Sequence, residues 1–210
     1  MANALTDTAK NAMLSSTAGS PAWPPGWCSL HTGDPGSTGA NEATGGSPAY
    51  ARKAATWAAA SAGSRALAAT FPVFDVPAGT YYYLGYWSAS TVGTFWAYSP
   101  LGGGARKAFT CNAAGVTADT FDSPAHGFTN GQQVVAWATI GAALPTGVSE
   151  GNAYFVVGAA TDTFQLSLTS GGAAINITAI GDGDVQLIVP ETFAGQGTYT
   201  VTAGSISLPG

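Results

Sequence analysis

Apolar and polar residues alternate most clearly in the segment TDTFQLSLT, at residues 161–169. Phe164, Leu166 and Leu168 share one face of an extended chain, whereas Thr163, Gln165 and Ser167 share the other. Successive side chains of a strand point to opposite faces, so a period of two marks a strand with one buried side. The pattern predicts a half-buried strand at residues 162–168.

The stretch around this segment repeats short apolar runs that are separated by turn residues. Asn130-Gly131, Gly171-Gly172 and Asp182-Gly183 suit tight turns, because these residue types tolerate positive φ. Strands at such close spacing are typical of a small sandwich or barrel. We expect them at residues 107–112, 116–121, 133–138, 153–158, 162–168, 174–179 and 184–189.

The first hundred residues follow a different pattern. Leu5, Ala9, Ala12 and Met13 recur at helical spacing and predict a short amphipathic helix at about residues 4–14. The segment YYYLGYW, which ends at Trp87, is apolar on both faces and indicates a central strand covered on both sides. Further strands are expected at residues 27–32, 50–57, 66–76 and 94–98, with a turn at Asp34-Pro35-Gly36.

Two changes of pattern divide the chain. The run Gly102–Gly104 predicts a flexible linker, because glycines carry no side chain to pack. After Pro190 the Thr/Tyr-rich style of the first region returns. We therefore predict an all-β protein of two modules. Residues 1–104 with 190–210 form a β-sandwich-like module with a short N-terminal helix, which is interrupted by a second small β-sandwich or barrel module at residues 105–189.

Charged residues are scarce, which limits the kinds of partner that the surface can bind. Only 8% of residues are charged and the net charge is -5, against about 25% charged residues in ordinary domains. Six Lys and Arg residues make no basic stripe, so we expect no direct binding to nucleic acid. No apolar run reaches the roughly 18 residues of a membrane helix, and the first 20 residues lack signal-peptide features. A surface so poor in charge suits an assembly component, or alternatively a tough monomer.

Few ionisable groups lie near each other in the sequence. His31 with Asp34, and Asp122 with His126, could each be half of a metal or acid–base site, but no further ligand follows nearby. We interpret the first pair as a strand-end histidine beside an Asx turn. We expect no catalytic, cofactor-binding or metal-binding residue and no cofactor. Cys28 and Cys111 are expected to be buried thiols, with a disulfide as the alternative.

Aromatic residues gather in the first module and leave three interpretations open. They could pack in the core, form a protein interface, or make a platform for a sugar. A sugar site usually adds carboxylates and amides, which are scarce nearby. The aromatic residues concerned are Trp23, Trp27, Tyr81, Tyr82, Tyr83, Tyr86, Trp87 and Trp96.

The stretch SLHTGDPGSTGANEATGGSPAYARKAATW carries a specific string of residues. Together with FDVPAGTYYYLGYWSASTVGTF and FAGQGTYTVT, it resembles a family of small virion proteins of tailed bacteriophages. The resemblance covers about residues 1–105 and 191–210. Its signature residues are Leu30, His31, Thr32, Asp34, Pro35, Gly36, Gly39, Ala40, Asn41, Glu42, Gly45, Gly46, Tyr50, Ala51 and Arg52.

A second stretch, from SPAHGFTNGQQ to TFQLSLTSGGAAI, resembles a β module that recurs in phage fibre, tail and other virion proteins. The chain departs from that pattern at two positions. Gln132 stands where the module usually has an acidic residue, and Phe155 stands in its Tyr-Tyr pair. The resemblance implies no chemistry for either position.

These resemblances imply a non-enzymatic structural protein of the phage virion, assembled in the host cytoplasm. The leading expectation is a minor tail or tail-tip component that docks through its first module. The alternatives are a capsid decoration protein and a carbohydrate-binding or polysaccharide-cleaving tail protein. Expected partners are copies of itself in a symmetric homo-oligomer and other tail or capsid proteins, with a host cell-surface glycan as a further candidate. No direct nucleic-acid contact and no membrane insertion are expected.

Overall fold

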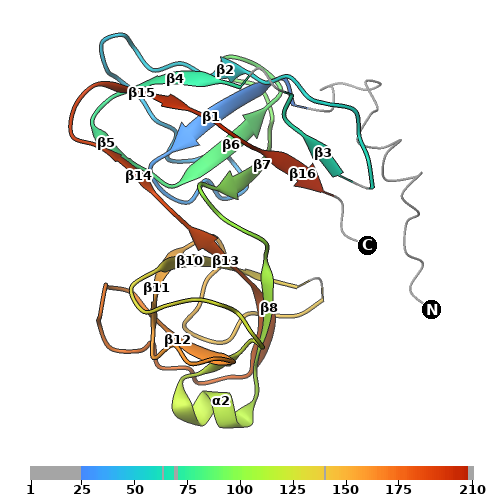
Figure 1. Cartoon of the computed structure of the whole chain (residues 1–210), viewed down its shortest axis with the longest axis vertical. Helices are drawn as coiled ribbons and strands as arrows, with labels where there is room; N and C mark the ends of the chain where they lie inside the picture. Colours follow the sequence, from blue (N-terminus) through green and yellow to red (C-terminus); the bar gives the residue numbers. More distant parts are fainter. Residues whose placement is uncertain (1–24, 63, 69–70, 140, 208–210) are drawn as a thin grey trace. The chain divides into compact units, whose positions relative to one another are not determined.

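The computed structural model describes residues 25–62, 64–68, 71–139 and 141–207. Apart from one short helix, the regular elements of these ranges are strands, which confirms the all-β prediction (Figure 1). The chain divides into two compact units. The first unit comprises the residues up to Ser99 and those from Thr192 onward, and the barrel unit comprises Pro100–Glu191. The helix predicted at residues 4–14 and the side chain of Trp23 lie outside the described residues.

The first unit contains a four-stranded sheet in the order β2-β1-β6-β7. Its strands are β1 (Trp27–His31), β2 (Lys53–Ala54), β6 (Tyr83–Trp87) and β7 (Phe95–Pro100). All five residues of β6 are buried, which confirms a central strand covered on both faces. That strand is shorter than predicted, because Tyr82 interrupts the regular strand and β6 begins only at Tyr83. The Tyr82 amide still donates to the carbonyl of His31.

The closing segment of the chain pairs with strands of the first unit. β14 (Glu191–Phe193) lies beside β5 (Gly79–Tyr81), β15 (Gly197–Thr200) beside β4 (Val73–Val76), and β16 (Ser205–Ser207) beside β3 (Ser64–Ala66) (Figure 1). The first unit is therefore built from two separate stretches of sequence.

Two strand predictions in the first unit were too long. The strand expected at residues 50–57 is reduced to β2, and Trp57 adds only an isolated bridge to Leu67. Its alanines offer little side chain to bury, and Ala54 and Thr56 are exposed. The strand expected at 66–76 is divided between β3 and β4.

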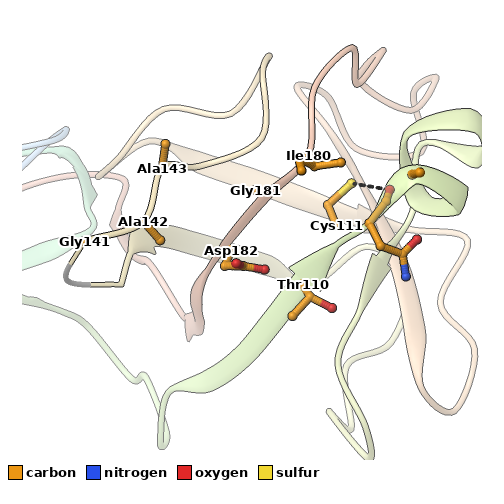
Figure 2. Close-up of a pocket in the computed structure, with 10 residues that line it drawn as sticks. Thr110, Cys111, Gly141, Ala142, Ala143, Ile180, Gly181 and Asp182 are labelled. Atoms are coloured by element: carbon orange, nitrogen blue, oxygen red, sulfur yellow. Dashed lines mark hydrogen bonds between the residues drawn. The ribbon is translucent and has the colours of Figure 1, made fainter. Parts of the chain in front are cut away.

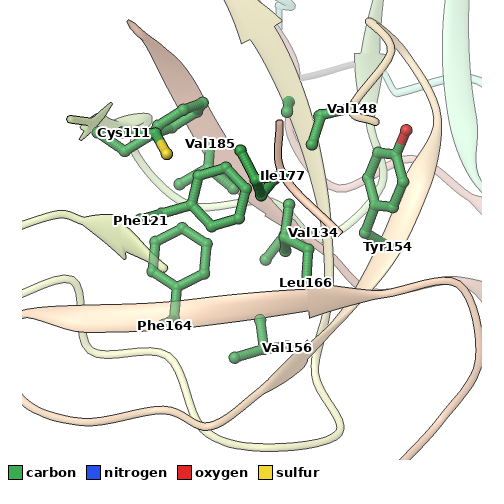
Figure 3. Close-up of a cluster of buried hydrophobic side chains, with 12 residues drawn as sticks. Cys111, Phe121, Val134, Val148, Tyr154, Val156, Phe164, Leu166, Ile177 and Val185 are labelled. Atoms are coloured by element: carbon green, nitrogen blue, oxygen red, sulfur yellow. The ribbon is translucent and has the colours of Figure 1, made fainter. Parts of the chain in front are cut away.

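The barrel unit is a closed antiparallel barrel, which decides between the two architectures expected for it. Its strand order is β10-β11-β12-β9-β8-β13. Phe121 stacks on Phe164 and meets Phe109 edge-on, with ring centroids 5.3 and 5.2 Å apart. Figure 3 shows Phe121 and Phe164 converging in the interior with Val134, Val156 and others. The strands are β8 (Lys107–Cys111), β9 (Phe121–Asp122), β10 (Gln133–Ala138), β11 (Ala153–Val157), β12 (Thr163–Ser167) and β13 (Gly181–Ile188).

The strand predicted at 116–121 is wrong. The chain forms helix α2 (Ala113–Ala118) instead, and β9 begins only at Phe121. The side chain of Asn112 caps the helix by accepting hydrogen bonds from the amides of Ala114 and Gly115, both at 2.9 Å. An N-terminal cap of this kind satisfies amides that a helix leaves without intrahelical partners.

Three further expectations in the barrel unit need correction. No strand forms at residues 174–179, where the Ile177 amide instead donates to the Asp119 carboxylate at 2.7 Å. Asp182-Gly183 is not a turn but part of β13, where Gly183 pairs with Ala138 of β10 and Phe109 of β8. Glycine is required there because a Cβ would lie 2.5 Å from the carbonyl oxygen of Trp137. Leu168 lies just beyond β12 and is 71% exposed, so the buried face ends at Leu166.

Candidate functional site

Ser29 and His31, on β1, form the base of a polar network under the loop that follows this strand. The His31 Nδ1 lies 2.7 Å from the carbonyl oxygen of Ala40, and its Nε2 lies 2.7 Å from the Ser29 hydroxyl. A carbonyl oxygen only accepts, so Nδ1 carries the proton and Nε2 accepts the hydrogen of Ser29. Trp87 Nε1 donates to the same hydroxyl oxygen at 2.8 Å. The histidine thus ties the loop to the sheet.

The Ser29–His31 pair has the hydrogen bond of an activated nucleophile. Both side chains are 0% exposed, however, so no substrate reaches the hydroxyl in this conformation. Burial is the largest influence on the His31 pKa and lowers it, so the ring is neutral at pH 7. The pair serves to hold the loop, and among the described residues no cluster of three or more metal-ligating side chains occurs.

The turn after β1 is shaped by the signature residues. The Asp34 carboxylate accepts the Gly36 amide at 3.0 Å, and the Asn41 side chain donates to the Asp34 carbonyl at 2.8 Å. This confirms the predicted Asx turn. Gly39, at φ 74°, faces the rings of Trp87 and Phe95 so closely that a Cβ would collide with both.

Arg52 connects this loop to a second one. Its guanidinium makes two hydrogen bonds to the Glu42 carboxylate, at 2.8 and 2.7 Å, and stacks 3.4 Å from the centre of the Trp87 ring. It also donates to the carbonyls of Ala89, at 3.1 Å, and Val92, at 2.6 Å. Both partners of the ion pair are largely buried, at 9% and 20% side-chain exposure. Two signature residues therefore fix the loop between β6 and β7.

The far end of the signature loop is held from two sides. The Tyr50 hydroxyl accepts the Leu30 amide at 2.7 Å, and burial raises the pKa of this tyrosine. The Gln196 side chain, from the closing segment, accepts the Ser47 amide at 3.0 Å. Gly46 faces Gln196 with little room for a side chain. The loop between β1 and β2 is thus fastened along its length.

A shallow hollow in the barrel unit is the other candidate site (Figure 2). Its lining is mainly small side chains and backbone, with one carboxylate from Asp182 and the thiol of Cys111. Burial, together with the neighbouring carboxylates, raises the pKa of Cys111. The lining therefore offers no paired acid and base. The lining residues are Thr110, Cys111, Asn112, Ala113, Gly141, Ala142, Ala143, Ile180, Gly181 and Asp182.

The structure does not bring His126 and Asp122 together as ligands. His126 Nδ1 accepts the Phe128 amide at 2.9 Å, which leaves Nε2 to donate to the Thr163 carbonyl at 3.2 Å. The Asp122 carboxylate instead accepts from Asn112 at 2.9 Å. Both groups are used to join strands and loops of the barrel.

The run Gly102–Gly104, predicted as a flexible linker, packs in part against the end of β13. A Cβ on Gly103 would lie 2.5 Å from the Leu187 carbonyl oxygen, and the Gly104 carbonyl accepts from the Gln186 side chain at 2.7 Å. Close packing explains glycine at Gly102 and Gly103, whereas a Cβ on Gly104 would meet nothing within 4 Å. Arg106 lies 4.1 Å from the centre of the Trp137 ring.

Four of the seven described residues of the aromatic cluster belong to the core. Tyr81, Tyr83, Tyr86 and Trp87 are buried, whereas Trp27 and Tyr82 are half-buried and Trp96 is 37% exposed. The two free cysteines, Cys28 and Cys111, are both buried, as predicted. Sequence reasoning did not find the Arg52 contacts to the β6–β7 loop or the role of Ser29, because these partners are far apart in sequence or have no distinctive spacing.

Comparison with known protein families gives a match to the first part of the chain. A family described as podophage GP4 fiber I protein gp80 matches residues 4–104, which is 101 of the 210 residues. The matched stretch contains the signature loop, Arg52 and the β6–β7 loop, whereas Gln196 lies beyond it. No curated protein and no solved structure matches the chain. Within the described ranges, no helix has the length and apolar character needed to span a membrane. The match supports a phage tail-fibre-like family for this chain, and with it a structural protein of the virion.

Proposed function

We propose that the chain is a non-enzymatic structural component of a phage tail, in a minor tail or tail-tip position. The observation that carries the proposal is the match of residues 4–104 to a fibre protein family. The matched residues include the polar network of His31 and Arg52, which holds loops in place and leaves no reactive group accessible. This is the arrangement of a scaffold that presents surface loops.

The chemistry of the described residues supports a role without turnover. The one Ser–His pair is sealed from solvent, and the hollow of the barrel unit has a single carboxylate. Hydrolysis of a polysaccharide needs two carboxyl groups placed on either side of the bond. A carbohydrate-cleaving role is therefore the weaker proposal, as is a capsid decoration protein, which the fibre match does not favour.

The first unit is proposed to dock onto neighbouring virion proteins and copies of itself. Low charge favours this, because few charged groups would have to be desolvated in an interface. The barrel unit would then face solvent. A symmetric homo-oligomer is proposed, because most soluble oligomers are closed, symmetric assemblies of one chain.

The protein content of purified particles tests the proposal. We expect the chain to co-purify with intact particles through a density gradient at a constant ratio to the tail proteins. Purified protein incubated with host surface polysaccharide should release no reducing ends, and the double variant His31→Ala with His126→Ala should behave identically in that assay. A turnover that the double variant loses, with its fold intact, would contradict the non-enzymatic role.

A further inference from the structure

The closing segment, residues 192–207, lies on the outside of the strands that it pairs with. β15 pairs with β4 and β16 pairs with β3, and each pair is a two-stranded sheet of its own (Figure 1). Within the described residues, the segment therefore contributes no strand to the four-stranded sheet β2-β1-β6-β7. Its departure would unpair the edges of β3 and β4 and leave the strand order of that sheet unchanged.

Few side chains of the closing segment are buried. Across residues 192–205, Val201 alone is fully buried, at 2% exposure, and the other residues are half-buried or exposed. Phe193 adds an edge-on contact with Tyr81, with ring centroids 6.0 Å apart. Backbone hydrogen bonds, such as that from the Val201 amide to the Pro72 carbonyl at 3.0 Å, supply much of the rest. A segment that buries so little apolar area opens more readily than a core strand.

The connection that leads into the closing segment is short and stiff. β13 ends at Ile188 and β14 begins at Glu191, so only Val189 and Pro190 join them. Proline fixes its own φ, and it pushes the residue before it toward extended backbone. Short hinges are a common setting for the exchange of a terminal element between copies of a protein.

We infer that the closing segment is exchanged between copies, so that residues 192–207 of one chain complete the first unit of another. The inference rests on the proposed self-association of the first unit. The structure itself indicates the occupant, because the edges of β3 and β4 already hold this segment. A second copy carries the identical segment, whereas a different protein would have to match both edges in register.

Exchange keeps the contacts of the closed chain, because the same residues meet in the same register. The balance between the two forms therefore depends on the local concentration of neighbouring copies, which assembly on a particle raises. A segment that leaves its own chain exposes unpaired strand edges, and such edges readily accept another strand. Exchange can be reciprocal between two copies, or it can pass from each copy to the next and close into a ring.

A pair of cysteines across the contact reports which chain supplies the segment. Val73 of β4 and Thr200 of β15 are directly opposed, and both are exposed. The Cα atoms of opposed residues in antiparallel strands lie about 4.5–5.5 Å apart, which a disulfide can span. Full-length Val73→Cys and Thr200→Cys chains with different tags are co-expressed and oxidised. Non-reducing electrophoresis then measures the covalent dimer that carries both tags.

Three controls accompany this pair. Asp75→Cys with Thr198→Cys is a second directly opposed pair, which guards against poor geometry at one position. Ala108→Cys with Asp184→Cys is the matched control in the barrel unit, because a closed barrel keeps its own strands β8 and β13 paired. Chains that all carry Thr200→Cys measure chance contact between neighbouring copies.

We expect each pair across the closing segment to give at least about tenfold more covalent dimer than the barrel pair or Thr200→Cys alone. No excess from both pairs would refute the exchange, while oligomers of the wild-type protein in sedimentation would leave the proposed self-association standing. A wild-type protein that sediments as a monomer, again with no excess, would overturn both. As much dimer from either control as from the two pairs would also refute the inference.

Discussion

At the scale of single residues, Arg52 joins three parts of the first unit. It pairs with Glu42 in the signature loop, stacks on Trp87 of β6 and binds two carbonyls of the β6–β7 loop. The planar guanidinium can make all of these contacts together because its donors form a fixed fork, which a lysine ammonium cannot reproduce. Its position in the signature is therefore explained by geometry.

Replacing Arg52 by Met should destabilise the protein by about 3 kcal/mol, because it leaves the largely buried Glu42 carboxylate without its partner. Arg52→Lys should fall between Met and wild type, since it keeps the charge but not the fork. Arg106→Met removes an exposed cation from Trp137 and serves as the control, with a cost below about 1 kcal/mol. Urea unfolding measures all three, and equal costs for the two Met variants would contradict the role of Arg52.

Because His31 is buried, we predict that the stability of the folded protein depends on pH. Its folded pKa lies below the ordinary value of 6.5 because the ring is buried. Well above pH 6.5 the ring is neutral in both states. Below that pH the unfolded chain binds a proton that the folded chain does not, so stability falls, by up to about 1.4 kcal/mol per pH unit for this one group. Groups facing the ring are Glu42, Asp34 and Arg52.

The measurement is the urea midpoint at pH 7.5 and 5.5. Wild type should lose more stability between the two pH values than His31→Gln, which should be less stable at pH 7.5 because it disrupts the bonds to Ser29 and Ala40. An identical loss in the two proteins would show that His31 is not the titrating group.

At the scale of elements, periodicity located most strands but not their ends. β10 occupies the predicted range, and β6 is central as its two apolar faces indicated. The predictions failed where a distant partner decides the local structure. Gly183 looks like a turn in sequence, but its missing side chain serves close packing against Trp137 within β13. Asn112 caps a helix that strand propensity alone did not reveal.

Close packing around Gly183 leaves no room for one added methyl group. Gly183→Ala should destabilise the barrel by about 2 kcal/mol or more, because the new Cβ meets the Trp137 carbonyl, Leu144 and the Phe109 ring. Gly104→Ala is the matched control, since a Cβ there meets nothing within 4 Å. Thermal unfolding compares the two variants. If both melt alike, the close packing of β13 is not what requires glycine.

At the scale of the whole molecule, the chain leaves the first unit near Ser99 and re-enters it near Thr192. The sequence suggested this through the return of a Thr/Tyr pattern, and the pairing of β15 with β4 shows where that pattern belongs. The site was less accessible to prediction. The signature includes Glu42 and Arg52. Only the folded structure shows that Arg52 bonds to the β6–β7 loop, at Val92, while Glu42 holds the guanidinium in place.

The barrel unit should fold on its own. Its six strands close on themselves, and its core is formed by its own side chains. Residues 100–191 expressed alone should give a dispersed amide NMR spectrum that overlays the corresponding signals of the full chain. A collapsed spectrum would show that the barrel depends on the first unit.

The most direct test of the tail assignment is electron microscopy of intact particles labelled with an antibody to this protein. A gold label confined to the tail or its tip is the expected result, and it should be absent from particles lacking the gene. Label distributed over the head would contradict the tail assignment and favour a capsid decoration protein. No label on particles that carry the gene, with an antibody that binds the purified protein, would contradict a virion role altogether.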